Sequence, residues 1–215
     1  MMRRMRKMTM NLNDQRGFTL IEMAIVLIII GIIIGAVVKG KDVMKSAEQK
    51  RLYSTFAREW QVAYNNYYDR TGWILGDGID NANTIRDGQC GNGGVAPAAV
   101  LDSQLTRVGL KPPAVGPTGL SNVRTYTDSS GRQYTLTLSF NYDADIGNYI
   151  QITGPRGIPV ELGYSWDRII DGSADGTAGD LRYDNNASPT ATGIAWPLAT
   201  AAPDNDSHIY LLLDF

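Results

Sequence analysis

Residues 17–38 read GFTLIEMAIVLIIIGIIIGAVV, and in the 21 residues from Phe18 to Val38 the only ionisable side chain is that of Glu22. As a helix these residues would extend about 32 Å, which matches the roughly 30 Å hydrocarbon core of a bilayer. A carboxylate in lipid is disfavoured by about 2 to 3 kcal/mol, so a charge kept there indicates a function. The stretch therefore predicts a membrane-spanning helix whose Glu22 needs a cationic partner.

The residues before this apolar run are basic. Residues 1–17 contain five Lys or Arg and one Asp, a net charge of +4, and they resemble the front of a targeting signal. A secretory signal peptide would have small residues for cleavage after the apolar run, whereas residues 37–41 read VVKGK. We therefore expect the apolar segment to be retained, and the basic leader favours a cytoplasmic amino end.

Residues 17–22, GFTLIE, follow a short basic leader and begin an uninterrupted apolar run. In this they resemble the prepilin cleavage and methylation motif of type IV pilins and type II secretion pseudopilins. The resemblance implies that a prepilin peptidase cuts between Gly17 and Phe18 on the cytoplasmic side and methylates the new amino group of Phe18. It also implies that Glu22 pairs with the amine of a neighbouring subunit during filament assembly.

The resemblance implies a structural subunit of a type IV pilus or a type II secretion pseudopilus, and not an enzyme. Its expected partners are the prepilin peptidase, other copies or related pilins, and the membrane before assembly. We expect the chain in the bacterial inner membrane as a single-pass protein, and then in a periplasmic or cell-surface filament. The alternative is an uncleaved, inner-membrane-anchored binding module with an acidic head that holds calcium or another ligand.

Two glycines divide the apolar segment. Gly31 and Gly35 are four residues apart, a spacing that lets helices approach closely in lipid, so we expect this face to pack against other copies. The sequence thus predicts a leader at 1–17, a transmembrane or filament-core helix at 18–42, and a globular head at 43–215.

Beyond the membrane segment, aromatic side chains recur at helical intervals. No proline occurs between Phe18 and Asp69, so a single helix of 52 residues is expected to run through both halves. Its outer half is amphipathic, and an aromatic series is expected to pack against a sheet. The series consists of Tyr53, Phe56, Trp60, Tyr64 and Tyr67.

Alternating apolar residues and turn signals predict four antiparallel strands. The expected strands are 122–127, 133–140, 149–153 and 208–215, and the apolar run of the last indicates a buried position. Shorter helices are expected at 98–108 and 160–170. The predicted fold is α+β and pilin-like, with a long helix packed on a roughly four-stranded antiparallel sheet.

Two groups of acidic residues are candidates for calcium, the one cofactor that the sequence suggests. Ca²⁺ takes six to eight oxygen ligands, which carboxylates and loop carbonyls supply. The resemblance adds support for the first group below, because some pseudopilins bind calcium in a loop of that part of the chain. The first group is Asp171, Asp175, Asp180 and Asp184, and the second is Asp77, Asp80 and Asp87 with Asn81 and Asn83. Neither has EF-hand spacing, and aspartates that stabilise turns beside glycines are the alternative interpretation.

Charge and the scarcity of Cys and His narrow the function further. From Thr71 onward the chain has 8 basic and 16 acidic residues, a net charge of −8, which disfavours nucleic acid as a partner. Cys90 is the only cysteine, so no disulfide within the chain and no zinc site is expected. His208 is the only histidine, and its neighbour Ser207 would point to the opposite face of a strand, so catalysis has little support.

Overall fold

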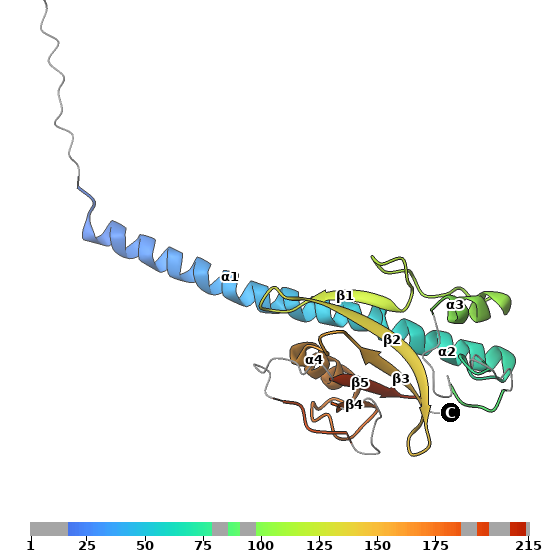
Figure 1. Cartoon of the computed structure of the whole chain (residues 1–215). Helices are drawn as coiled ribbons and strands as arrows, with labels where there is room; N and C mark the ends of the chain where they lie inside the picture. Colours follow the sequence, from blue (N-terminus) through green and yellow to red (C-terminus); the bar gives the residue numbers. More distant parts are fainter. Residues whose placement is uncertain (1–16, 79–85, 91–97, 186–192, 198–206, 214–215) are drawn as a thin grey trace, which may run out of the picture. The chain divides into compact units, whose positions relative to one another are not determined.

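The computed structural model describes residues 17–78, 86–90, 98–185, 193–197 and 207–213. The chain divides into two compact units, Met1–Met44 and Lys45–Phe215. Four helices and five strands are described (Figure 1). In chain order they are α1 (Leu20–Thr55), α2 (Ala57–Thr71), α3 (Ala98–Arg107), β1 (Val123–Thr127), β2 (Gln133–Asp143), β3 (Gly147–Thr153), α4 (Val160–Ile170), β4 (Leu181–Asp184) and β5 (His208–Leu212).

The expected long helix is present from Leu20 to Thr71, and it is distorted at Phe56, where α1 ends and α2 begins. Phe56 has φ −131° and ψ −78°, and its N–H donates to the Tyr53 carbonyl at 3.4 Å. The hydroxyls of Ser54 and Thr55 both donate to the Arg51 carbonyl, at 2.9 and 2.8 Å. Side-chain hydroxyls that bond back to the helix compete with its backbone ladder and bend it.

The sheet is antiparallel and has five strands in the order β1-β2-β3-β5-β4. The four expected strands are present, so the prediction missed β4. This strand has only four residues, Leu181–Asp184, and follows a glycine-rich segment, so alternation could not identify it. It pairs with β5, which therefore lies between β3 and β4, and this explains why the apolar run of β5 is buried.

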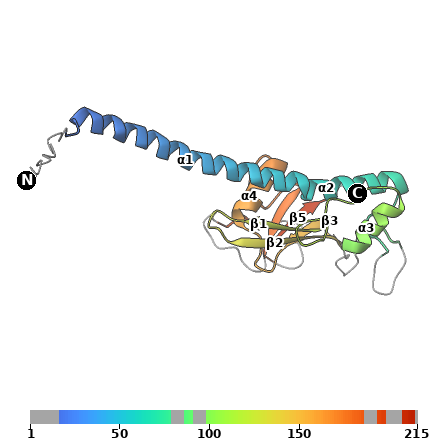
Figure 2. The ribbon, with the colours of Figure 1, turned by 90° about the horizontal axis from the view of Figure 1, so that it is seen from above.

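The aromatic series forms the contact between helix and sheet, as expected. Trp60 and Tyr64 pack on Phe140 of β2, with ring centroids 5.8 and 5.6 Å apart. Phe56, Trp60 and Tyr64 are fully buried. From Lys45 onward α1 continues into α2 along one face of the sheet (Figures 1 and 2). Burial of each large aromatic side chain contributes about 2 to 3 kcal/mol, so this contact is a main source of stability of the head.

The head contacts α1 from Lys45 onward through polar groups as well. The Lys45 ammonium lies 4.1 Å from the centroid of the Tyr126 ring and donates to the Thr127 carbonyl. The side-chain amide of Gln49 donates to the Tyr126 hydroxyl at 3.0 Å. The backbone carbonyl of Gln49 accepts from the indole of Trp166 in α4 at 3.1 Å. These bonds fix α4 and the first strand against the helix.

Candidate functional site

The amino end of α1 is closed by a reciprocal pair of side chains, Thr19 and Glu22. The Glu22 Oε2 atom accepts from the Thr19 backbone N–H at 2.7 Å and from the Thr19 hydroxyl at 2.8 Å. The Glu22 backbone N–H in turn donates to Thr19 Oγ1 at 3.3 Å. This arrangement is a capping box, which satisfies two backbone N–H groups that a helix start otherwise leaves without partners.

The capping box gives Glu22 a second role that sequence reasoning missed. From the sequence we expect a cationic partner for Glu22, whereas in the single chain the carboxylate has two uncharged donors from Thr19. The signal was present in the order Thr-x-x-Glu before an apolar run. Thr19 is thus a further residue of the site, because it holds the carboxylate at the helix start.

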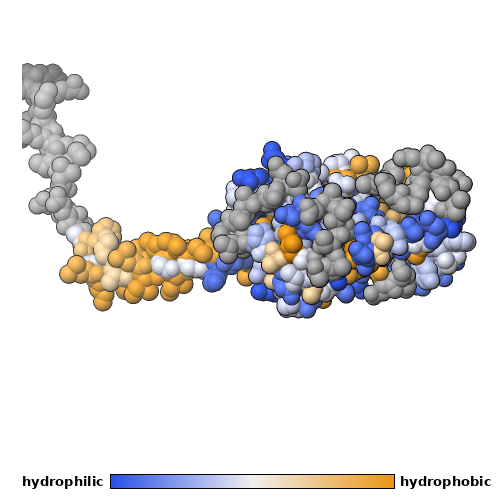
Figure 3. Space-filling model, turned by 60° about the horizontal axis from the view of Figure 1, so that its bottom comes forward, coloured by the Kyte–Doolittle hydropathy of each residue, from blue (hydrophilic) through white to orange (hydrophobic). Residues whose placement is uncertain are grey.

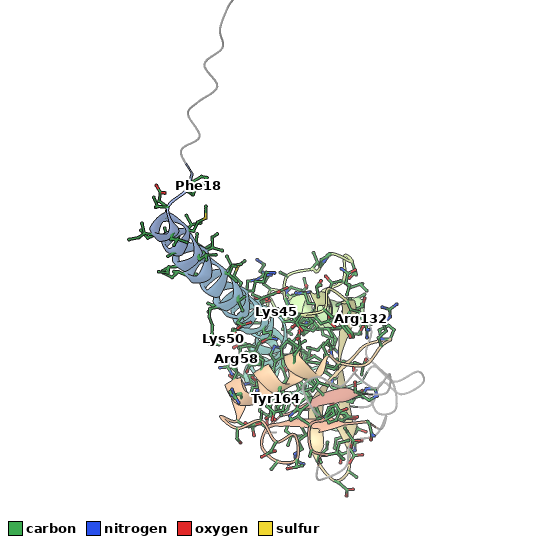
Figure 4. All side chains as sticks on the ribbon, turned by 90° about the vertical axis from the view of Figure 1, so that its left-hand side faces the viewer. Phe18, Lys45, Lys50, Arg58, Arg132 and Tyr164 are labelled. Carbon is green, nitrogen blue, oxygen red and sulfur yellow. The ribbon has the colours of Figure 1, made fainter. Side chains whose placement is uncertain are left out.

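Gly17 and Phe18 lie ahead of α1, outside the helix, and Phe18 is 79% exposed (Figure 4). Backbone outside regular structure and next to an exposed side chain is accessible to an enzyme. Cleavage between the two residues and methylation of Phe18 stay predictions.

The apolar part of α1 is exposed along its whole length. Every residue of 17–44 is exposed, and apolar side chains cover most of this part of the helix (Figure 3). Such a surface is far larger than the apolar patches that soluble monomers expose. A helix of this length and composition is able to cross a membrane.

Gly31 and Gly35 face open space on this helix. A Cβ atom added at either position would meet no atom within 4 Å. Neither glycine is therefore required by the packing of the single chain. Their expected contact with other copies stays a prediction.

The first group of aspartates surrounds the loop after α4. Asp171 accepts from the backbone N–H groups of Asp180 and Leu181, at 2.9 and 3.0 Å, and Asp175 accepts from those of Thr177 and Ala178. Among the described residues, no group of three or more His, Cys, Asp or Glu side chains is placed to hold a metal ion. The bonds show aspartates that stabilise a turn, and calcium binding by Asp171, Asp175, Asp180 and Asp184 stays a prediction.

Asp167 is a buried aspartate of the same region that the sequence analysis did not single out. Its Oδ2 atom accepts from the Trp196 indole at 2.6 Å and from the Gly176 N–H at 3.0 Å, while Oδ1 has no hydrogen-bond partner among the described residues. Burial raises the pKa of Asp167, and the hydrogen bonds from Trp196 and Gly176 oppose the rise. Gly163 and Gly176 make room for the Trp196 ring, which a Cβ at either position would approach within 3.0 Å.

The second group of aspartates is only partly described. Asp77 is 2% exposed, and its carboxylate accepts from the backbone N–H groups of Asp87 and Gly88 at 3.2 and 3.0 Å. Asp80, Asn81 and Asn83 lie outside the described residues. Through these two bonds Asp77 stabilises the connection between α2 and α3. Calcium binding at this second group also stays a prediction.

The residues weighed for catalysis have structural contacts. The Cys90 thiol is fully buried and donates to the Leu75 carbonyl at 3.3 Å, and burial raises its pKa, which disfavours the reactive thiolate. Ser207 Oγ accepts from the Ile158 N–H at 2.7 Å, and the His208 ring lies 3.4 Å from the Gln151 amide. These contacts give the three side chains roles in packing and hydrogen bonding of the head.

Comparison with known proteins matches the chain to one family model, the prokaryotic N-terminal methylation motif, over residues 12–38. The matched range contains Gly17, Phe18, Thr19 and Glu22, and it extends through the apolar part of α1. The match is consistent with the type IV pilin and pseudopilin family, on which the sequence analysis drew. Searches of curated proteins and of solved structures returned no match.

Proposed function

We propose that this chain is the precursor of a filament subunit, of the kind found in type IV pili or in the pseudopilus of type II secretion. A prepilin peptidase would cut between Gly17 and Phe18 and methylate Phe18. The apolar part of α1 would hold the subunit in the inner membrane and then leave the bilayer to form the filament core, with the α+β head outward.

The observation that carries this proposal is that the methylation motif at 12–38 extends into a helix whose apolar part is not buried in the single chain. Apolar surface of this extent needs a cover, which lipid supplies before assembly and the helices of other copies supply afterwards. A motif without an exposed helix would support only processing, and a helix without the motif would support only anchoring. Together they favour processing followed by assembly.

The capping box adds a step to the proposed role of Glu22. In the precursor, Thr19 supplies both donors to the carboxylate. Cleavage creates a cationic amine at Phe18, and pairing of Glu22 with the amine of a neighbouring copy would exchange neutral donors for a charged one. Because the carboxylate is charged in both pairings, the gain is the Coulomb attraction between carboxylate and ammonium, which is larger in a low-dielectric surrounding than in water and favours assembly.

Mass spectrometry of the mature amino terminus tests the proposal. The expected result is a chain that begins at methylated Phe18 in a filament fraction sheared from cells. Recovery of the chain from membranes alone, with Met1 or the leader still attached, would contradict it.

A second candidate is an uncleaved, membrane-anchored binding module. The observation that favours it is the same capping box, because Thr19 reduces the need of Glu22 for an external cation. This candidate predicts that residues 1–17 stay on the chain. The same mass measurement therefore separates the two candidates.

A further inference from the structure

A groove in the Lys45–Phe215 unit lies between the helix α1–α2 and the segment before β1. It has a volume of about 360 Å³. The charged side chains of the lining come from the helix and from β1, and the segment before β1 supplies apolar residues. The lining includes Arg51, Leu52, Glu59, Val115, Gly116 and Arg124.

The guanidinium of Arg124 is fixed at the base of this groove. Its Nη1 atom donates to the carbonyls of Ser121 and Val123 at 3.1 and 2.8 Å, and Nη2 donates to that of Ala114 at 2.6 Å. The group also lies 5.1 Å from the centroid of the Phe56 ring. A guanidinium has five N–H donors, so two of them make no hydrogen bond to the described residues.

Gly116 shows that the loop is fitted around Arg124. A Cβ at this position would lie 2.2 Å from the Val123 carbonyl oxygen and 2.9 Å from Arg124 Nη1. Only glycine allows the loop to come this close to the guanidinium without displacing it. The position of the positive charge is thus built into the fold.

Two further charged groups at the groove have unused bonding capacity. Glu59 Oε2 is buried and has no hydrogen-bond partner among the described residues, although Glu59 is near enough to act on the charge of Arg124. The Arg51 side chain is exposed and makes no ion pair with any described residue. The groove therefore offers two guanidinium groups and one acceptor, and its local charge is positive.

The charge of the groove is opposite to that of the rest of the head. Residues from Thr71 onward carry a net −8, so copies of this chain present many carboxylates to one another. An Asp or Glu residue of a second copy would fit these groups. Its carboxylate would accept from Arg51 and Arg124, and its backbone N–H would donate to Glu59. Apolar walls such as Leu52 and Val115 would cover the stem of such a side chain.

We propose that this groove binds an acidic surface segment of a second copy of the chain, as a head-to-head contact of the assembled subunit. The inference rests on the proposed filament function. It adds a contact outside the apolar helix, in which electrostatic complementarity sets the register between heads.

Site-specific photo-crosslinking from Val115 in the full chain, expressed in cells, tests the contact. Val115 is 66% exposed on the wall of the groove, so a benzophenone side chain there would reach the occupant. The expected adduct joins two copies of the chain, through a peptide that contains Asp or Glu. An adduct with a different protein, or none in a filament fraction that contains the chain, would overturn the inference.

Matched charge reversals separate the groove from general charge. Arg51→Glu should lower the yield of this adduct about fivefold or more, because like charges would then meet across the contact. Lys50→Glu makes the same change at an exposed neighbour outside the groove (Figure 4) and should leave the yield within about twofold. Equal loss in both variants would overturn the inference.

The amino terminus of the same samples distinguishes this failure from failure of the proposed function. Mature, methylated Phe18 in filaments without a groove adduct would contradict the contact alone. An intact leader and absence from filaments would contradict both.

Discussion

Glu22 combines two roles that usually belong to different residues. Its carboxylate closes the capping box with Thr19, and by resemblance it is expected to meet a neighbour's amine. A Gln at this position in a capping box still bonds to the backbone N–H of the N-cap residue, but it has no charge. Substitution by Gln therefore separates helix capping from charge pairing.

We predict that Glu22→Gln and Glu22→Ala both abolish incorporation into filaments, whereas Thr19→Ala reduces it less. The reason is that Thr19→Ala costs about 0.5 to 2 kcal/mol of helix capping but leaves the charge. Immunoblots of sheared filament and membrane fractions measure the three variants. If Glu22→Gln assembled normally, capping and not charge would be the role of this residue.

At the scale of elements, the contact between the helix and the sheet is a main source of the stability of the head. Trp60 of α2 is fully buried, packs on Phe140, and donates from its indole to the Ser121 carbonyl at 3.2 Å. Trp73, just after the same helix, is 46% exposed. The two tryptophans form a matched pair for measuring how much burial of the side chain contributes to the free energy of unfolding.

Trp60→Ala should lower the free energy of unfolding of the head by about 3 to 5 kcal/mol, because it leaves a large cavity in the core. Trp73→Ala should cost less than about 1 kcal/mol. Denaturant titration of the full chain in detergent, followed by near-ultraviolet circular dichroism, measures both. Similar losses in the two variants would contradict the assignment of this contact as the core.

The loop between α4 and β4 allows a test of the calcium hypothesis. If Asp171 and Asp180 bind Ca²⁺, addition of Ca²⁺ should raise the melting temperature of the EGTA-treated chain. At a Ca²⁺ concentration of about 100 times Kd, binding would stabilise the folded state by about 2.7 kcal/mol. Asp180→Asn should remove most of this rise, while Asp145→Asn, at an exposed turn elsewhere, should not. A melting temperature that Ca²⁺ leaves unchanged would show that these aspartates only stabilise the turn.

At the scale of the whole molecule, the two units expose opposite kinds of surface. Residues 17–44 are exposed and mostly apolar, whereas the Lys45–Phe215 unit buries a core of its own. Gly31 and Gly35 touch nothing in the single chain, so substitutions there act through helix propensity and through contacts with lipid or with other copies.

Gly31→Leu with Gly35→Leu should leave membrane insertion and cleavage unchanged and reduce filament assembly several-fold, because large side chains keep neighbouring helices apart. Gly40→Leu is the control, since Gly40 also faces open space but lies beyond Val38. Quantification of mature chain in membrane and filament fractions checks the expectation. Normal assembly of the double variant would exclude this face from helix packing.

Local sequence patterns predicted the apolar helix, the aromatic contact, four of the five strands and the short helices. These features follow from periodicity and length, which depend only on neighbours along the chain. The motif at residues 17–22 likewise lies in one short segment, so the match to the methylation motif was predictable.

Features that join residues distant in the chain depend on how the elements pack in three dimensions. The strand β4 exists because β5 pairs with it, and the Asp167–Trp196 bond spans 29 positions. The groove brings Glu59 to Arg124 and to the loop at Gly116. Packing of separate elements places these groups, so no local pattern marks them, whereas the capping box of Thr19 and Glu22 is local and was legible in the sequence.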